Sequence, residues 1–142
     1  RDYPSISKHH FSSSDEFGDI QDVAPMDLDA TRNGKGDNLK YLIIDVREES
    51  ELRNDGNLGT DRADWIHIPL GVIRNVSDKE ELTELLKDKG IEDVEEYQDF
   101  YFLCKVGIRS HHAAKHVLEL DVDQTLFNIN GGIMRYHSDV GL

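Results

Sequence analysis

Short apolar runs alternate with segments of helical periodicity along most of the chain. Strand-like runs are expected at residues 21–24, 39–46, 65–68, 99–103 and 125–129. The centre of the second run, Tyr41-Leu42-Ile43-Ile44, is continuously apolar, as expected for a strand that is covered on both faces. Strands that alternate with helices in this way are typical of an α/β fold with a mostly parallel sheet.

The segments between these runs carry the signals of helices and loops. Helices are expected at residues 25–32, 48–53, 78–89 and 109–120, and from residue 133 onward. Pro25 suits the first turn of the first helix, whose weak apolar face consists of Met26, Leu28 and Ala30. A loop is expected at residues 54–64, a plain connection at 70–75 and a tight glycine turn at 130–132.

The chain divides into an arm and a single domain. Residues 1–20 are polar, include five serines and have neither a helical nor a strand period, so we expect a flexible arm or linker. The stretch 21–142 has a length that suits one domain with one core. Because the chain starts at Arg1 and not at a methionine, we expect a fragment of a longer polypeptide. As to assembly, we expect a monomer or a part of a larger chain.

The charge of the chain limits its partners. A net charge of −13 argues against nucleic acid and anionic membrane surfaces. No apolar run approaches the ~20 residues of a membrane span, and no signal-peptide core lies near the start. The single cysteine gives no sign of an oxidising compartment, so we expect a cytoplasmic protein. Ten acids against three lysines lie between residues 78 and 99, which we interpret as a solvated surface, with a docking face for a basic partner as the alternative.

The single cysteine, Cys104, is the candidate for chemistry. A lone cysteine is most often a buried structural residue, but this one ends an apolar strand and is followed by a glycine loop and a helix. The segment from Cys104 to His116 contains no acid, and its basic residues are Lys105, Arg109, Lys115 and three histidines. A helix that begins near Arg109 adds a partial charge of about +0.5 at its amino end. This environment favours a reactive thiolate.

The length of the loop limits what it can hold. Four residues separate Cys104 from Arg109. Loops of cysteine-based phosphatases, which cradle a whole phosphate, resemble Cys-x₅-Arg, and a loop one residue shorter makes a smaller bowl, suited to one extra sulfur atom. The spacing therefore favours sulfur chemistry over a phosphatase or an arsenate reductase.

Two further groups of polar residues have mainly structural interpretations. Asp45 and Arg47 follow the strand at 39–46, and we expect them to form a salt bridge that supports the loop. His112 and His116 lie four residues apart near Cys104, but a structural zinc site needs four ligands, so we expect no metal.

Four stretches carry a family resemblance. Residues 104–110 (CKVGIRS) resemble the active-site loop of the rhodanese, or sulfurtransferase, family. Three other stretches are similar to that family in order and spacing, namely 42–48 (LIIDVRE), 66–71 (IHIPLG) and 128–133 (NINGGI). The match covers roughly residues 21–137. The resemblance implies a rhodanese-like fold, with a five-stranded parallel sheet flanked by helices.

The resemblance also implies a mechanism. Cys104 takes the outer sulfur of thiosulfate or of another persulfide and passes it to a nucleophilic acceptor, with no cofactor. The loop that would bind the substrate and stabilise the persulfide consists of Lys105, Val106, Gly107, Ile108, Arg109 and Ser110. Arg109 and Lys105 are expected to neutralise anions, and Ser110 to cap the loop or the helix.

Two motifs, Cys-Lys-x-Gly-x-Arg-Ser at 104–110 and Gly-Gly-Ile-x-x-Tyr at 131–136, look most similar to those of rhodanese domains fused to adenylating enzymes, which sulfurate ubiquitin-like carriers. The chain departs from that subgroup in its longer 54–64 loop and in its last residues, SDVGL. A free-standing rhodanese is the alternative to a fused domain. A non-catalytic rhodanese-like binding module is the alternative to an enzyme.

Overall fold

One parallel sheet forms the centre of the molecule. The computed structural model describes residues 19–34, 40–58 and 63–141. Within them, five strands pair in parallel in the order β1-β5-β4-β2-β3. These strands are β1 (Ile20–Val23), β2 (Lys40–Asp45), β3 (Trp65–His67), β4 (Tyr97–Leu103) and β5 (Thr125–Ile129).

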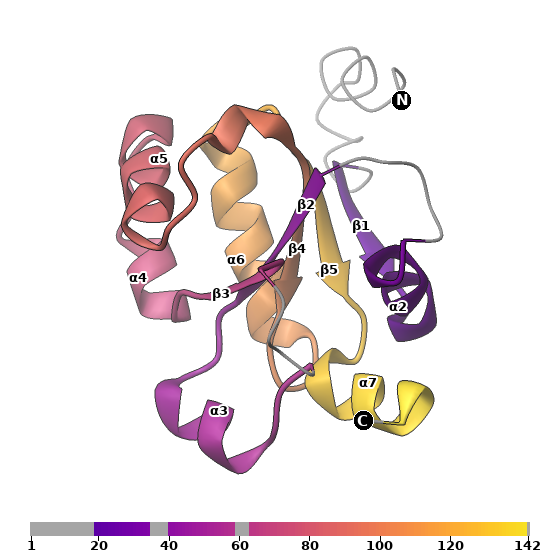
Figure 1. Ribbon diagram of the computed structural model, residues 1–142. Coiled ribbons are helices and arrows are strands. Elements are labelled where there is room, and N and C mark those ends of the chain that lie inside the picture. The colour runs from indigo at the N-terminus through magenta and orange to yellow at the C-terminus, as the bar shows by residue number, and fades with distance from the viewer. Residues whose placement is uncertain (1–18, 35–39, 59–62, 142) are drawn as a thin grey trace.

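Helices cover both faces of this sheet (Figure 1). They are α2 (Pro25–Arg32), α3 (Glu49–Asn54), α4 (Leu70–Arg74), α5 (Lys79–Asp88), the short 3₁₀ helix η2 (Val94–Glu96), α6 (Ile108–Glu119) and α7 (Gly132–Val140). The start of α6, the start of α7 and α3 all lie at the lower edge of the molecule in Figure 1.

The two faces of the sheet have separate hydrophobic cores because successive strand residues point in opposite directions. In β4, Phe100 and Phe102 pack under α4, α5 and α6, together with Cys104 just beyond the strand. Tyr101 and Leu103 point the other way and pack against α2 and α7. The alternation therefore assigns Cys104 to the face that α6 covers.

The structure confirms the α/β class, the five parallel strands and the helices on both faces. It corrects three local predictions. Residues 70–74 form α4, not a plain connection, because Leu70 and Ile73 lie on one side of a helical turn and are buried. Strand β4 begins at Tyr97, two residues early, where Tyr97 pairs with Lys40. The side chain of Met26 is exposed, so it does not share the buried face of Leu28.

The predicted arm falls largely outside the described residues, and β1 begins at Ile20, one residue ahead of the predicted domain boundary. Part of the predicted 54–64 loop also lies outside them, at residues 59–62. Every acid from residue 78 to residue 96 is exposed, which fits a solvated surface, whereas Asp99 is buried. None of the helices in the described part of the chain combines the length and apolar character that crossing a bilayer requires.

Candidate active site

Cys104 lies directly after β4, and its side chain has no exposed surface. Gly107 donates its backbone N–H to the Cys104 sulfur at 3.1 Å. Gly107 stands immediately before α6, so the sulfur lies at the amino end of that helix, where an anion is favoured. Gly107 has a φ of +100°, and a Cβ there would come within 3.0 Å of the Gly131 nitrogen. Both features require a glycine at this position.

A chain of side-chain hydrogen bonds leads away from the sulfur. The Cys104 thiol donates to the Ser110 hydroxyl at 3.2 Å, and that hydroxyl donates to Oδ1 of Asn128 at 2.5 Å. The Asn128 amide nitrogen donates in turn to the Gly107 carbonyl and to Asp22, both at 3.1 Å. Ser110 therefore contacts the sulfur directly, as expected for a member of the persulfide-stabilising loop, and no side-chain hydrogen bond caps α6.

Asn128 and Asp22 did not emerge as site residues from the sequence. Asn128 belongs to β5 and Asp22 to β1, and parallel pairing of these strands places the two residues side by side. One signal was available in the sequence, because Asn128 is a polar residue inside the otherwise apolar run Leu126–Ile129. A buried polar side chain in a core strand needs partners, which here are the loop and Ser110.

The start of α7 holds the loop from the other side. Ile133 donates its backbone N–H to the Cys104 carbonyl at 2.9 Å, and Met134 donates to the Lys105 carbonyl at 3.2 Å. A Cβ on Gly132 would lie 2.4 Å from the carbonyl carbon of Lys105. The glycine turn predicted at 130–132 therefore allows α7 to approach the cysteine loop closely.

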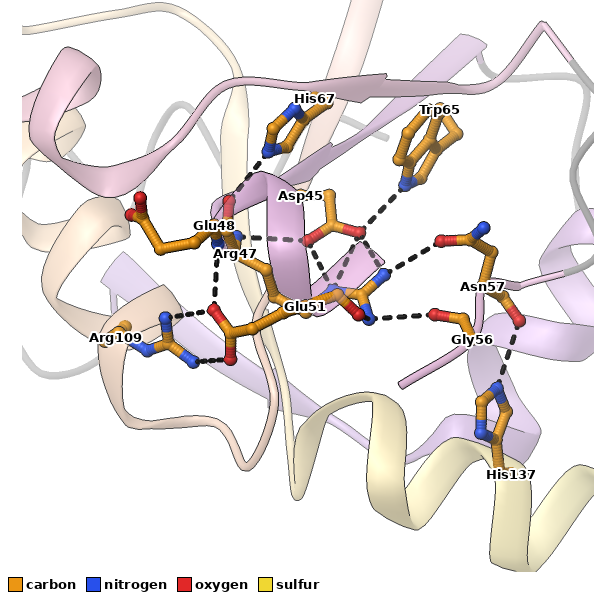
Figure 2. Close-up of polar contacts among 10 residues, drawn as sticks. All are labelled: Asp45, Arg47, Glu48, Glu51, Gly56, Asn57, Trp65, His67, Arg109 and His137. Carbon is orange, nitrogen blue, oxygen red and sulfur yellow. Dashed lines mark hydrogen bonds and ion pairs between the residues drawn. The ribbon is translucent and has the colours of Figure 1, made fainter. Parts of the chain in front are cut away.

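Arg109 is paired with an acid from α3. Its guanidinium donates to both carboxylate oxygens of Glu51, at 2.7 and 2.6 Å (Figure 2). The hydrogen bonds from Arg109 lower the pKa of Glu51 to about 2, and the same contact raises the pKa of Arg109. The sequence suggested an acid-free basic loop, but this acid lies 58 residues before Arg109 and arrives only through the fold.

The other loop residues lie at the surface. Lys105 is within 3.8 Å of the Asp55 carboxylate, so the second cation of the loop also faces an acid. Val106 and Ile108 have exposed side chains. Of the predicted loop residues, Gly107 and Ser110 contact the sulfur, and the two cations of the loop, Lys105 and Arg109, face carboxylates.

The predicted salt bridge of Asp45 and Arg47 is confirmed. The two side chains are fully buried and 2.7 Å apart. Arg47 also donates to the Gly56 carbonyl at 2.8 Å and to the Asn57 side chain at 3.1 Å, while the Trp65 indole donates to Asp45 at 3.1 Å (Figure 2). This pair fastens the segment after α3, and with it Glu51 and Asp55, beside the cysteine loop.

The remaining candidates do not join this site. His116 places Nε2 at 2.8 Å from the Val76 carbonyl, and His112 is exposed. Among the residues that the structure describes, no three His, Cys, Asp or Glu side chains converge so as to hold a metal ion. A hollow of about 410 Å³ lies at the amino ends of β4 and β5, and its lining contains none of the predicted site residues.

No family model matches the chain, and no curated protein matches its sequence. Solved structures do match. One is a Saccharomyces cerevisiae protein described as a homologue of single-domain rhodanese and of the Cdc25 phosphatase catalytic domain, with 22% identity, a TM-score of 0.60, and 92% of this chain and 88% of that chain covered. Another is the As-Sb reductase of Leishmania major, with 19% identity, a TM-score of 0.58, and 86% and 79% covered.

A third match, the reduced CoADR-RHD protein of Bacillus anthracis, has 24% identity and a TM-score of 0.52. The match covers 85% of this chain but only 17% of that longer chain. Further matching structures are also of rhodanese-like proteins. At these identities the comparisons establish the fold alone: the chain has a rhodanese-like fold.

Proposed function

We propose that the protein is a sulfurtransferase that carries a sulfane sulfur on Cys104. The observation behind this proposal is the hydrogen bond from the Gly107 N–H to the Cys104 sulfur at the start of α6. A backbone N–H at a helix amino end stabilises negative charge, either on a thiolate or on the terminal sulfur of a persulfide. The short spacing from Cys104 to Arg109 supports the same assignment.

The reaction has two balanced halves. The Cys104 thiolate attacks the outer sulfur of a donor R–S–SH, a new S–S bond forms at Cys104, and R–S⁻ leaves with the electrons of the broken bond. A nucleophilic acceptor then attacks the outer sulfur of the Cys104 persulfide and regenerates the thiolate. In this scheme the Gly107 N–H stabilises the charged sulfur, and Ser110 does so once its hydroxyl proton turns from Asn128 to the sulfur. Neither half requires a metal, an oxidant or an organic cofactor.

The proposal extends to the molecule that accepts the sulfur. The resemblance of residues 104–110 to rhodanese domains fused to adenylating enzymes supports a protein acceptor, such as the tail of a ubiquitin-like sulfur carrier. Such a domain would act in the cytoplasm, as a monomer or as a part of a longer chain.

Two rivals have observations in their favour. Phosphatase or reductase chemistry is suggested by the similarity to a homologue of the Cdc25 phosphatase catalytic domain and to an As-Sb reductase. The four-residue gap between Cys104 and Arg109 is short, however, for an oxyanion the size of phosphate. A binding module without turnover is suggested by the complete burial of Cys104. The hydrogen bond from the Gly107 N–H to the Cys104 sulfur suits a reactive thiolate, and so favours the transferase over a binding module.

A turnover assay with three substrates separates these functions. The protein and its Cys104→Ser variant would each receive a cysteine persulfide with a thiol acceptor, an aryl phosphate, or arsenate with a thiol. The proposal expects sulfur transfer that the variant lacks, and no turnover of the other two. Phosphate hydrolysis or arsenate reduction that depends on Cys104 would contradict it, and so would the absence of turnover with every substrate.

A further inference from the structure

We infer that the sulfur donor is a cysteine persulfide in a peptide segment with apolar side chains beside it, and not a small dianion such as thiosulfate. This inference rests on the proposed function, because it concerns delivery of sulfur to Cys104. Three features of the described residues support it: the paired cations of the loop, the neutral charge balance that results, and exposed apolar side chains around the loop.

Both cations of the cysteine loop face acids. Arg109 binds Glu51 through two hydrogen bonds of 2.7 and 2.6 Å, and Lys105 lies 3.8 Å from Asp55. Both acids belong to α3 or to the segment directly after it, which the buried pair of Asp45 and Arg47 fastens in place. Two cations against two carboxylates leave these four side chains with no net charge.

A dianion therefore gains little at this loop. To bind there, thiosulfate would have to compete with Glu51 for Arg109, whose guanidinium already has a bidentate carboxylate partner. The Debye length is about 8 Å at physiological ionic strength, so distant charges are screened and the nearest acids decide the local potential. The net charge of −13 adds no attraction for an anion at longer range.

Three apolar side chains of the loop and of α7 are exposed. Val106 is 51% exposed and Ile108 is 63% exposed, and both belong to the loop or to the first residue of α6. Met134 is 48% exposed, and its backbone N–H bonds to the Lys105 carbonyl, so it lies beside the same loop. Exposed apolar side chains gathered around a polar site favour an apolar partner. A peptide with apolar residues next to its persulfide matches both this surface and its balanced charge.

The test compares rates of sulfur uptake by Cys104, measured by rapid-quench intact mass. The donors are one peptide persulfide with apolar neighbours, the same peptide with glutamates at those positions, a small organic persulfide, and thiosulfate. We expect the apolar peptide to react about tenfold or more faster than each of the others. Equal or faster uptake from thiosulfate, from the acidic peptide or from the small persulfide would overturn the inference. No uptake from any donor would instead contradict the proposed function.

Two variants with matched controls separately test the pairing of Arg109 with an acid and the exposed apolar side chains. Glu51→Gln keeps an oxygen for the helix cap but removes the charge opposite Arg109, so it should raise uptake from thiosulfate about tenfold relative to the apolar peptide. Its control is Glu49→Gln, an exposed change on the same helix that should leave this ratio unchanged. Met134→Ser should lower the preference for the apolar peptide over the acidic one, whereas Met26→Ser, an exposed change on α2, should not. If Glu51→Gln and Met134→Ser both leave their ratios unchanged, the inference is wrong.

Discussion

The carboxylate of Glu51 binds the guanidinium of Arg109 through two hydrogen bonds, and so joins α3 to the cysteine loop. The same carboxylate accepts the Glu48 backbone N–H at 2.8 Å and thereby caps α3 (Figure 2). One side chain thus fixes the start of a helix and a cation of the cysteine loop. The charge of Arg109, which the local sequence leaves free, is balanced within the fold.

Glu51 should make stability depend on pH in the acid range. Its pKa falls from the ordinary 4.5 to about 2 in the folded protein, so below pH 4.5 the unfolded chain binds a proton that the folded protein does not. The contribution of Glu51 is therefore complete above pH 4.5 and is lost as the pH falls towards 2. Glu51→Gln should cost about 1–2 kcal/mol at pH 7 and flatten this part of the profile. Urea unfolding at several pH values measures both, with Glu49→Gln as the control, and a wild-type slope that persists in Glu51→Gln would contradict the assignment.

Ser110 should affect sulfur chemistry more than an ordinary buried hydroxyl does. Its hydroxyl contacts the Cys104 sulfur and is itself held by Asn128. With the neutral thiol the Ser110 hydroxyl accepts from Cys104, and after ionisation its single proton has to turn from Asn128 to the thiolate. A hydrogen bond to a charged group contributes about 1.5–3 kcal/mol, so Ser110→Ala should slow persulfide formation at least about tenfold. Rapid-quench mass analysis measures the rate, with the exposed Ser138→Ala on α7 as the control. Equal rates in Ser110→Ala and the wild type would show that this contact is only structural.

Removal of one partner from the buried pair of Asp45 and Arg47 should be among the most destabilising single substitutions in the loop region. Arg47→Met leaves the carboxylate of Asp45 buried without its cation, which costs about 3–5 kcal/mol in comparable sites. The exposed pair of Arg53 and Glu49 provides the comparison, since Arg53→Met should cost less than about 0.5 kcal/mol. Chemical denaturation gives both values. Similar losses of unfolding free energy in Arg47→Met and Arg53→Met would mean that burial of the ion pair does not determine how much its removal destabilises the protein.

Gly132 should tolerate no side chain. Its φ is +64°, and a Cβ would lie 2.4 Å from the Lys105 carbonyl carbon, which is backbone and cannot turn aside. Gly132→Ala should therefore cost at least about 2 kcal/mol and slow sulfur uptake by shifting the loop. Gly71→Ala, in α4 with nothing near its Cβ position, should be neutral or stabilising by up to about 1 kcal/mol. Thermal unfolding and uptake rates compare the two, and a Gly132→Ala protein with normal values in both would refute the close approach.

The fold was largely predictable because the core strands are apolar at their centres and are bounded by turn residues. The run Tyr41–Ile44 and the run Phe100–Leu103 needed both faces covered, which requires helices on both sides. Helix α4 was not predictable in the same way. It has only five residues, begins after Pro69 and contains Gly71, so turn signals outweighed the spacing of Leu70 and Ile73.

The site was predictable only where its residues are consecutive. Cys104, Gly107 and Arg109 fall within one loop, so their proximity follows from the sequence alone. Glu51 and Asn128 reach the same loop from a helix 58 residues before Arg109 and from a neighbouring strand. Such contacts depend on the order of the strands and on the path of α3, and neither can be predicted from the local pattern of charges.

The central claim is that Cys104 forms a persulfide, and the intact mass of the protein after incubation with an apolar peptide persulfide tests it most directly. The account predicts a gain equal to one sulfur atom, located on Cys104 by peptide mapping, absent in Cys104→Ser and reversed by a thiol acceptor. An unchanged mass in the folded wild-type protein, or an equal gain in Cys104→Ser, would contradict it.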